Sequence, residues 1–378
     1  MNASLSEKLS AVKWGEFRLG DLFTKRTIKG VPKNKEDLTP NKNGFHMFGQ
    51  NIKYQYPQRI LLDKKYLQSV DYQHPILAYT SSVGEIGIIK ESFYRSGDNG
   101  AFQGLFSKEH QFTLKELYFV LPILQKEFDK FGYDTSMANT INLQFSLPIT
   151  SPGKIDFDFM ESFIAELEAE RVAELSAYLT VSGLDNYELT EKEIATIEKI
   201  KNKEVHFKEF EFIEIFNNIK QGRRLKKEDQ LTGNVPFVMS GTTNSGIVGY
   251  ISNPVAFFRK NSITIDIFGN CFYRNYDFGA GDDTGVYWST DHTYSKATML
   301  FFTTAMERSL HGKYSYGKKL RSSQSLHFKM QIPAKDGKPD YTTMETLISA
   351  VQKLVIKEVV LYANQKIETT KAVTKRYW

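Results

Sequence analysis

The sequence lacks several groups that extracellular, membrane and metal-binding proteins need. Its 378 residues include one cysteine, which excludes a disulfide framework and a cysteine-rich zinc site. No apolar run is long enough to span a bilayer, and the first residues lack the apolar core of a signal peptide. We therefore expect a cytoplasmic protein with no membrane segment, in which Cys271, inside an apolar run, is a buried packing thiol.

Motifs of the common nucleotide-binding and hydrolytic enzymes are also missing. The sequence contains no G-x-x-x-x-G-K-[ST] loop, no strand–G-x-G-x-x-G–helix and no G-x-S-x-G elbow. Its seven histidines never pair at the spacing of a metal site such as H-E-x-x-H. Gly281-Asp282-Asp283 resembles an acidic polymerase triplet, but a turn explains it better. These absences favour a binding protein with no catalytic residues, no metal and no cofactor in this chain.

The sequence does contain a repeat of about half its own length. Residues 14–23 (WGEFRLGDLF) and 207–216 (FKEFEFIEIF) place apolar residues at the same positions. The ends of the two copies also match, with Met160-Glu161 corresponding to Met344-Glu345. This period is too long for a solenoid or a propeller, so we expect two diverged copies of one domain.

Each copy begins with a head that reads as a mixture of short strands and a helix. Apolar runs such as 76–79 and 263–267 are bounded by Gly, Asn and Asp, which is typical of strands and turns. Helical spacing follows at 114–131, where Pro122 predicts a kink or a break, and at 297–310. We expect two α+β heads of roughly 130–150 residues, the usual size of a domain.

A long amphipathic helix is expected after each head. The first covers 157–179 and is ended by Gly183, the second starts near 342, and a short helix between them opens with a Thr190–Glu193 capping box. The apolar stripes could pack on their own heads or on each other as an antiparallel coiled coil. We favour the second arrangement, because neither head needs so long a helix to complete its core.

The predicted order of heads and helices gives domain boundaries and a distance between the heads. We expect target-binding heads at 1–155 and 206–338, and helical spacers at 156–205 and 339–378. A helix of about 35 residues spans about 50 Å, whereas one turn of DNA measures about 34–36 Å. Two heads held apart by such helices could therefore contact one duplex at two separate places.

Basic residues gather in three segments of a chain with a net charge of +5. Any one cluster could be a solvated loop, but the first two occupy equivalent places in the two copies, and phosphate binding needs such charges on flexible stems. The clusters are Lys25, Arg26, Lys29, Lys33 and Lys35; then Lys220, Arg223, Arg224, Lys226 and Lys227; and finally Lys313, Lys318, Lys319 and Arg321 among tyrosines.

Several segments carry a family resemblance that covers nearly the whole chain. They are the opening 17–23, the runs 222–229 (GRRLKKED) and 236–250 (PFVMSGTTNSGIVGY), and the exits from both heads around Met160-Glu161 and Met344-Glu345. With these segments, and with its order of head, helix, head and helix, the chain resembles the specificity subunits of type I restriction–modification systems and of related type IIB-like systems.

The resemblance implies a function and a set of partners. The heads would be target recognition domains that each read half of a bipartite sequence in double-stranded DNA, and the helices would act as a ruler. Two copies of a DNA adenine methyltransferase subunit would bind, and S-adenosylmethionine and any cleavage would belong to the partners. The exit Leu147-Pro148-Ile149 resembles a subgroup that works with fused methyltransferase–nuclease chains, so a separate nuclease subunit and a fused one both stay open.

Candidate contact residues follow from side-chain chemistry and from the basic clusters. Any one of them could instead be a turn residue that caps its own backbone. For phosphates we select Lys25, Arg26, Lys29, Lys220, Arg223, Arg224, Lys318, Lys319 and Arg321. For bases we select Gln50, Asn51, Ser81, Ser82, Arg95, Asn139, Asn142, Thr242, Thr243, Asn244, Arg259, Tyr316, Ser323 and Gln324. For the partner subunits we select Met160, Phe163, Leu167, Leu347, Val351 and Leu354.

Two rival functions use the same sequence differently. The chain could be a stand-alone DNA methyltransferase or nuclease with an unrecognised active site, in which case it would turn over without a partner. It could also be a helical scaffold that binds proteins alone, in which case it would bind no DNA duplex.

Overall fold

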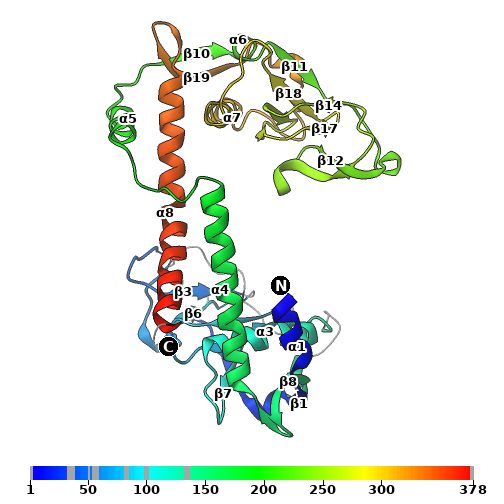
Figure 1. Ribbon diagram of the computed structural model, residues 1–378, viewed down its shortest axis with the longest axis vertical. Helices are drawn as coiled ribbons and strands as arrows, with labels where there is room; N and C mark the ends of the chain where they lie inside the picture. The colour runs from blue at the N-terminus through cyan, green and yellow to red at the C-terminus, as the bar shows by residue number, and fades with distance from the viewer. Residues whose placement is uncertain are drawn as a thin grey trace. The chain divides into compact units, whose positions relative to one another are not determined.

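The structure is a computed structural model, and it describes residues 3–31, 39–49, 52, 59–80, 85–97, 102–131 and 137–374. The chain divides into two compact units (Figure 1). Unit 1 consists of residues 1–175 and 366–378, and unit 2 of residues 176–365. The long helices therefore belong to both units, because the boundaries fall inside them.

The head of unit 1 is built from two antiparallel sheets and a small parallel pair of strands. One sheet has the order β1-β8-β9 (Trp14–Arg18, Gln144–Ser151, Lys154–Ile155). The other has the order β2-β7-β4-β5 (Phe23–Ile28, Phe102–Ser107, Ile76–Thr80, Ile86–Ile89). Strands β3 (His46–Phe48) and β6 (Phe93–Arg95) pair in parallel.

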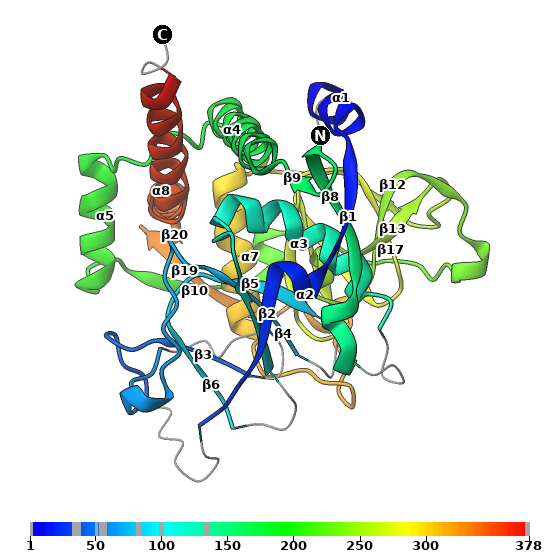
Figure 2. The same ribbon diagram turned by 90° about the horizontal axis from the view of Figure 1, so that it is seen from below.

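Helix α3 (Leu114–Phe128) completes this head by packing on β5 and β8 (Figure 2). Pro122 lies inside this helix without ending it, so of the predicted kink or break the structure excludes the break. The buried stripe Leu117, Val120, Leu124 and Phe128 packs into the core of unit 1 on both sides of the proline. Burial of that stripe stabilises the helix enough to outweigh the hydrogen bond that Pro122 cannot donate. Shorter helical segments are α1 (Ala3–Ala11), α2 (Leu19–Leu22), η2 (Lys64–Tyr66) and η3 (Met137–Asn142).

The head of unit 2 repeats this architecture. Its sheets have the orders β10-β19-β20 (Phe207–Glu211, Lys329–Lys335, Lys338–Pro339) and β11-β18-β15-β16 (Asn218–Gln221, Thr284–Trp288, Ser262–Asp266, Cys271–Arg274). A third sheet has the order β13-β12-β17-β14 (Ile247–Ile251, Thr232–Val238, Phe278–Ala280, Phe257–Phe258), in which β12 and β17 are parallel. The shorter segments are α6 (Phe212–Ile215), η4 (Lys227–Asp229), η5 (Thr243–Gly246) and η6 (Ser322–Gln324).

The core of unit 2 lies between these strands and helix α7 (Lys296–Leu310), which packs on β15, β16 and β19. Cys271 is buried in this core, as the sequence predicted, and burial raises the pKa of its thiol. The matching strand orders of the two heads confirm that the chain contains two copies of one α+β domain.

The long helices begin on the heads that precede them. Helix α4 (Phe157–Val181) starts at Asp156, whose carboxylate accepts a hydrogen bond from the backbone N–H of Phe159. Helix α8 (Tyr341–Thr374) starts in the same way at Asp340, which accepts from Thr343. Met160 and Met344 then insert into the cores of their own heads. The first turns of both helices thus pack on their own heads, which is the alternative that the sequence left open for the apolar stripes.

Helix-to-helix contacts are found farther along. In unit 1 the Nζ atom of Lys366, near the end of α8, lies 3.9 Å from the carboxylate of Glu168 in α4. In unit 2, Leu179, Val360 and Ala363 are buried on the helical segments outside the core of the head. Helix α8 has 34 residues, which corresponds to about 51 Å.

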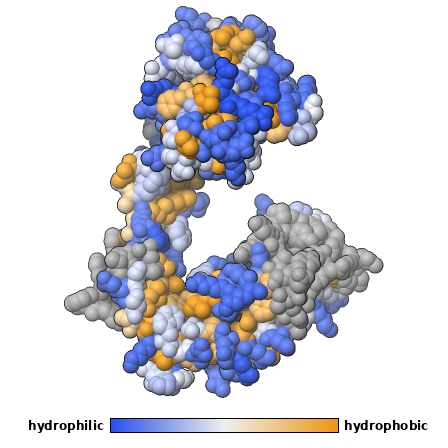
Figure 3. Space-filling model, turned by 90° about the vertical axis from the view of Figure 1, so that its right-hand side faces the viewer, coloured by the Kyte–Doolittle hydropathy of each residue, from blue (hydrophilic) through white to orange (hydrophobic). Residues whose placement is uncertain are grey.

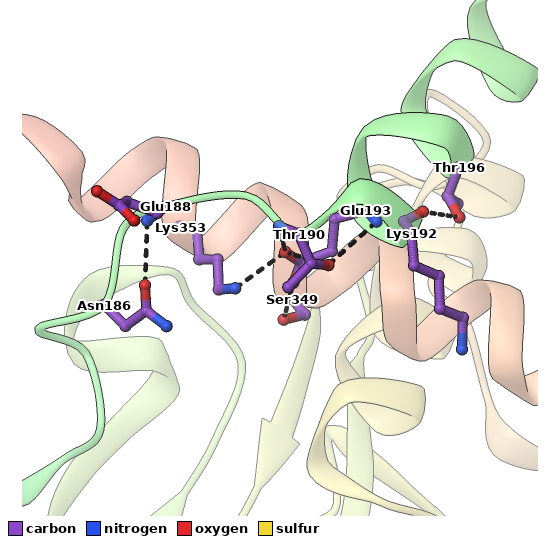
Figure 4. A network of polar contacts seen from close by, with 8 residues as sticks. All are labelled: Asn186, Glu188, Thr190, Lys192, Glu193, Thr196, Ser349 and Lys353. Atoms are coloured by element: carbon purple, nitrogen blue, oxygen red, sulfur yellow. Dashed lines mark hydrogen bonds and ion pairs between the residues drawn. The ribbon is translucent and has the colours of Figure 1, made fainter.

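A buried carboxylate fixes the short helix α5 (Glu191–Lys201) against α8 (Figure 4). Thr190 and Glu193 form the predicted capping box. The same Glu193 carboxylate accepts hydrogen bonds from the Ser349 hydroxyl at 2.6 Å and from the Lys353 ammonium at 2.9 Å. Burial alone would raise the pKa of Glu193, but these hydrogen bonds outweigh it and lower the pKa to about 2.

We predict that this carboxylate stabilises unit 2 at neutral pH and ceases to do so in acid. Its pKa is about 2 in the folded chain and 4.5 ordinarily, so the contribution is complete above about pH 4.5 and is lost as the pH falls toward 2. Glu193→Gln should lower the free energy of unfolding by about 1–3 kcal/mol at neutral pH, and the difference from wild type should shrink in acid.

Urea denaturation of both proteins at about pH 7 and about pH 3 measures this difference. The control is Glu191→Gln, at an exposed position in the same helical turn, which should differ little from wild type at either pH. A difference between Glu193→Gln and wild type that is equal at both pH values would contradict the prediction.

Candidate nucleic-acid interface

A groove of about 790 Å³ opens on the head of unit 2 beside β11, β14 and the end of β18. Its lining includes four basic and three aromatic side chains: Lys220, Arg223, Arg259, Lys260, Phe257, Phe258 and Trp288. The face of this unit that Figure 3 shows is largely hydrophilic, with hydrophobic groups scattered in it. Cations beside flat apolar rings suit a ligand that has both phosphates and bases.

Local contacts hold two of these cations over aromatic rings. The Lys220 ammonium lies 5.8 Å from the centre of the Trp288 ring, and the Arg259 guanidinium lies 5.3 Å from that of Phe257. Arg259 also donates to Asp277 at 2.7 Å. A backbone hydrogen bond from Lys260, followed by the one from Arg259, lowers the pKa of Asp277. The Arg259 guanidinium thus has a carboxylate partner while its side chain stays 81% exposed.

The start of the basic loop is fixed by a close backbone approach. A Cβ atom at Gly222 would lie 2.2 Å from the carbonyl oxygen of Gly281, so only glycine fits there. The next residue, Arg223, donates its backbone N–H to the Ala280 carbonyl at 2.9 Å, which leaves its exposed side chain at the groove. Arg224 follows and is also exposed.

A second exposed basic segment lies at 312–321. Backbone hydrogen bonds between Ser315 and Lys318 close its turn. The Lys318 ammonium lies 5.8 Å from the Tyr314 ring, and the Lys319 ammonium lies 4.8 Å from the ring of Tyr316, which is 82% exposed. This segment presents cations and a flat ring at the surface.

Arg321 and Gln324 have structural partners. The Arg321 guanidinium donates to the Asp282 carbonyl at 2.6 Å, and the Gln324 side chain accepts the backbone N–H of Arg321 at 3.1 Å. Gln324 therefore caps its own backbone, the alternative weighed for every polar candidate. Ser323 is exposed beside them. Asp282 and Asp283 lie in a turn closed by a hydrogen bond from Thr284 to Gly281, as predicted.

The remaining candidates of unit 2 lie together on one loop. Thr242, Thr243 and Asn244 are exposed between β12 and β13. Asn244 and Ser245 have left-handed backbones, with φ of 48° and 52°. Two such residues in succession are uncommon and cost free energy, so the surroundings must hold this loop in its shape.

In unit 1 the structure describes only part of the predicted surface. Lys25 and Arg26 lie on β2, where the Arg26 guanidinium is 4.8 Å from the Phe106 ring, and Lys29 follows the strand in an exposed position. Asn139 and Asn142 are exposed on η3. Gln50, Asn51, Ser81 and Ser82, together with Lys33 and Lys35, lie outside the described residues.

Arg95 requires a correction. Its side chain is buried, its guanidinium donates to the Ser96 hydroxyl at 2.7 Å, and it lies 5.4 Å from the Phe102 ring. The prediction that Arg95 reads a base does not fit this position, because the guanidinium is withdrawn from solvent. Its residue type gave no sign of burial, since arginine is usually exposed.

The selected partner residues also separate into two groups. Met160 and Phe163 are buried in the core of unit 1, and Leu167 packs against that core, so these three stabilise their own head. Val351 and Leu354 are exposed on α8, and Leu347 is partly buried. Among the side chains of this helix that the structure describes, the exposed large apolar ones are Val351, Leu354, Val355, Val359, Leu361 and Tyr362.

Within the part of the chain that the structure describes, no group of His, Cys, Asp and Glu side chains could hold a metal ion. In the same part of the chain, no helix is long and apolar enough to cross a membrane.

Comparison with known proteins identifies the family. The model of the type I restriction modification DNA specificity domain matches residues 11–177 and again residues 204–361. The chain belongs to this family. The two matches cover the two heads, most of α4 and the first part of α8, so the repeat found in the sequence is the family's own repeat.

Individual relatives agree with this assignment. The chain is 24% identical over 248 residues to the specificity subunit S.BcgI of a type II restriction enzyme from Heyndrickxia coagulans, a match that covers 64% of this chain and 67% of the relative. The crystal structure of a type I restriction–modification S subunit from M. genitalium is similar in fold, with a TM-score of 0.57, 14% identity and coverage of 97% and 95% of the two chains.

Membership of the family confirms the general role that the sequence resemblance implied. Specificity subunits recognise DNA within a restriction–modification complex and carry no catalytic site, so this chain is a recognition subunit and not an enzyme. A cofactor in this chain is not expected on the same ground.

We predict that Arg223 contributes a phosphate contact. Arg223→Ala should weaken binding to any duplex and reduce the slope of log K against log salt by about one, because one fewer counterion is released. Fluorescence anisotropy with a labelled duplex over a salt series measures both quantities. Arg308→Ala, at an exposed position of α7 outside the groove, should change neither, and an unchanged slope in Arg223→Ala would sink the assignment.

Proposed function

We propose that each head is a target recognition domain that contacts one half of a bipartite duplex through its basic loops, with boundaries near 1–155 and 206–338. The groove of unit 2 carries this proposal, because it combines cations with aromatic rings. Its Lys220 and Arg223 belong to the basic cluster that occupies the same place in the second repeat as the cluster at 25–35 in the first. The phosphate contacts in unit 2 are Lys220, Arg223, Arg224, Lys318 and Lys319, and their counterparts in unit 1 are Lys25, Arg26 and Lys29.

Base reading falls to the exposed polar groups beside these cations. In unit 2 these are Thr242, Thr243, Asn244, Arg259, Tyr316 and Ser323, and in unit 1 Asn139 and Asn142. Hydroxyl, amide and guanidinium groups can each discriminate base edges in the major groove.

The helical spacers at 156–205 and 339–378 supply the partner surface. On α8, Val351, Val355 and Tyr362 follow one another at intervals of four and seven residues, which places them on one helical face. Val355 is 73% exposed. An apolar helical face left open to solvent marks a protein-binding surface, and the occupant we propose is a DNA methyltransferase subunit.

Two copies of this subunit would bind, one for each half of the repeat, and S-adenosylmethionine would be bound by the methyltransferase. Cleavage would belong to a nuclease that is either a further subunit or fused to the methyltransferase. The complex would act in the cytoplasm, where the host DNA lies.

A methylation map tests the recognition role. The chain, produced with the methyltransferase subunit of its own system in a host that lacks other adenine methylation, should direct methylation to a motif of two short half-sites separated by unread bases. The purified chain alone should transfer no label from S-adenosylmethionine to DNA. Transfer by the chain alone would favour the rival enzyme, and a map with no recurring motif would exclude sequence recognition.

The partner surface is tested by changing its centre. Val355→Asp should weaken binding of the methyltransferase subunit by about tenfold or more, because a charge is placed in a desolvated apolar contact. The matched control is Lys357→Asp, an exposed residue about 200° around the helix, which should retain the partner. Affinity comes from titration of the two purified proteins, and full retention by Val355→Asp would exclude this face.

A further inference from the structure

The loop at 239–246, between β12 and β13, has a shape that its own sequence does not favour. Asn244 and Ser245 are left-handed, with φ of 48° and 52°. Gly246 has φ of 79°, and a Cβ atom there would lie 2.6 Å from the Met239 carbonyl oxygen. Non-glycine residues rarely adopt this conformation unless the surroundings enforce it. We call residues 239–246 the braced loop.

A buried arginine enforces the far end of the braced loop. Arg274, at the end of β16, is 1% exposed. Its Nη2 donates to the carbonyl oxygen of Ser245 at 2.7 Å. The same guanidinium donates to the Thr264 hydroxyl at 3.0 Å and to the Tyr276 hydroxyl at 2.9 Å. One planar group thus joins two strands and the loop.

Two carboxylates hold the near end of the braced loop. The Asp283 carboxylate accepts the backbone N–H of Ser240 at 3.0 Å, and the buried Asp266 carboxylate accepts that of Gly241, also at 3.0 Å. Asp266 is fixed in turn by the backbone N–H groups of Phe268 and Asn270. The backbone on both sides of Thr242–Asn244 is therefore tied to the sheet.

This arrangement is costly for a purely structural role. The described partners of the Arg274 guanidinium are neutral oxygens and two aromatic rings, with Phe272 at 5.2 Å and Phe278 at 6.0 Å. Burial lowers the pKa of Arg274, which indicates that the site disfavours its charge. An apolar side chain would fill the same space at lower cost, but it could not hold the Ser245 carbonyl.

We propose that Arg274, together with Asp266 and Asp283, positions the braced loop so that Thr242, Thr243 and Asn244 are preorganised to read bases. The inference rests on the proposed function of unit 2 in DNA recognition. A loop held in its binding shape loses little conformational freedom on contact with DNA, so its side chains discriminate between bases more sharply. Arg274 acts through the loop and touches no base itself.

The test separates positioning from stability. The protein is the full chain in complex with the methyltransferase subunit of its own system. Dissociation constants are measured for the target duplex found by the methylation map and for a duplex whose half-site for unit 2 is scrambled. Arg274→Lys keeps the charge and the stem, but one ammonium cannot reach all three acceptors. The discrimination ratio is the dissociation constant for the scrambled duplex divided by that for the target duplex. Arg274→Lys should lower this ratio by about tenfold, with affinity for the scrambled duplex unchanged.

Two further variants keep the test decisive. Tyr276→Phe removes one of the three acceptors and should lower the same ratio by a smaller factor. Tyr287→Phe removes a buried hydrogen bond to Ser325 of 2.7 Å in the same unit without touching the loop. It should lower the melting temperature while leaving the ratio unchanged.

Each outcome has a clear meaning. An unchanged ratio in Arg274→Lys overturns the proposal, and so does a parallel loss of affinity for both duplexes, which would mean a structural role. If the wild-type complex itself does not distinguish the two duplexes, the proposed recognition by unit 2 fails, and the role of Arg274 fails with it.

Discussion

Each head is joined to the helix that follows it by one repeated set of contacts. A hydroxyl at the N-cap of the head's own helix, Thr113 in α3 or Ser295 in α7, donates to a glutamate in the next long helix, Glu161 at 2.7 Å or Glu345 at 2.5 Å. The methionine before each glutamate is fully buried in the head. The buried methionine fixes how far the helix inserts into the head, and the hydrogen bond beside it fixes the rotation of the helix about its axis. The helix therefore leaves the head in one direction.

A bipartite reader depends on this joint. Phosphate and base contacts at two half-sites can form together only if each head is held rigidly on its spacer, because free rotation would have to be lost on binding. The network around Glu193 also restricts motion beside the second head. It fixes α5, which precedes that head, to α8, which follows it, through Ser349 and Lys353. The contacts of Glu193 are partly buried, and so salt screens them less than the exposed contacts that we assign to DNA.

The sequence was sufficient for the features that local chemistry decides. The repeat, the Thr190–Glu193 capping box and the end of the first long helix near Gly183 all follow from residue types at fixed spacing. Long-range packing decides the rest. The continuity of α3 through Pro122 and the burial of Met160 and Phe163 depend on a core assembled from distant strands, which periodicity along one segment cannot reveal.

The candidate site divides in the same way. Exposed cations at Arg223, Lys318 and Lys319 were predictable, because charge clusters in loops are usually solvated. Arg95 and Arg274 were not, since their sequence neighbours are those of ordinary strands. Trp288 and Phe257 were also missed, because aromatic residues in strands are normally core residues, and only the groove reveals their contact with cations.

The two buried arginines differ in a way that bears on how such a protein diversifies. Arg274 ends β16, whose counterpart in the first head, β5, ends at Ile89. Arg95 ends β6, whose counterpart β17 ends at Ala280. Each head buries an arginine against phenylalanine, yet at positions that do not correspond. The helix joints are shared between the copies, whereas the buried cations are not. The joints therefore belong to the common scaffold, and the buried cations belong to the individual head, where they can change with its reading loops without disturbing how the heads are mounted.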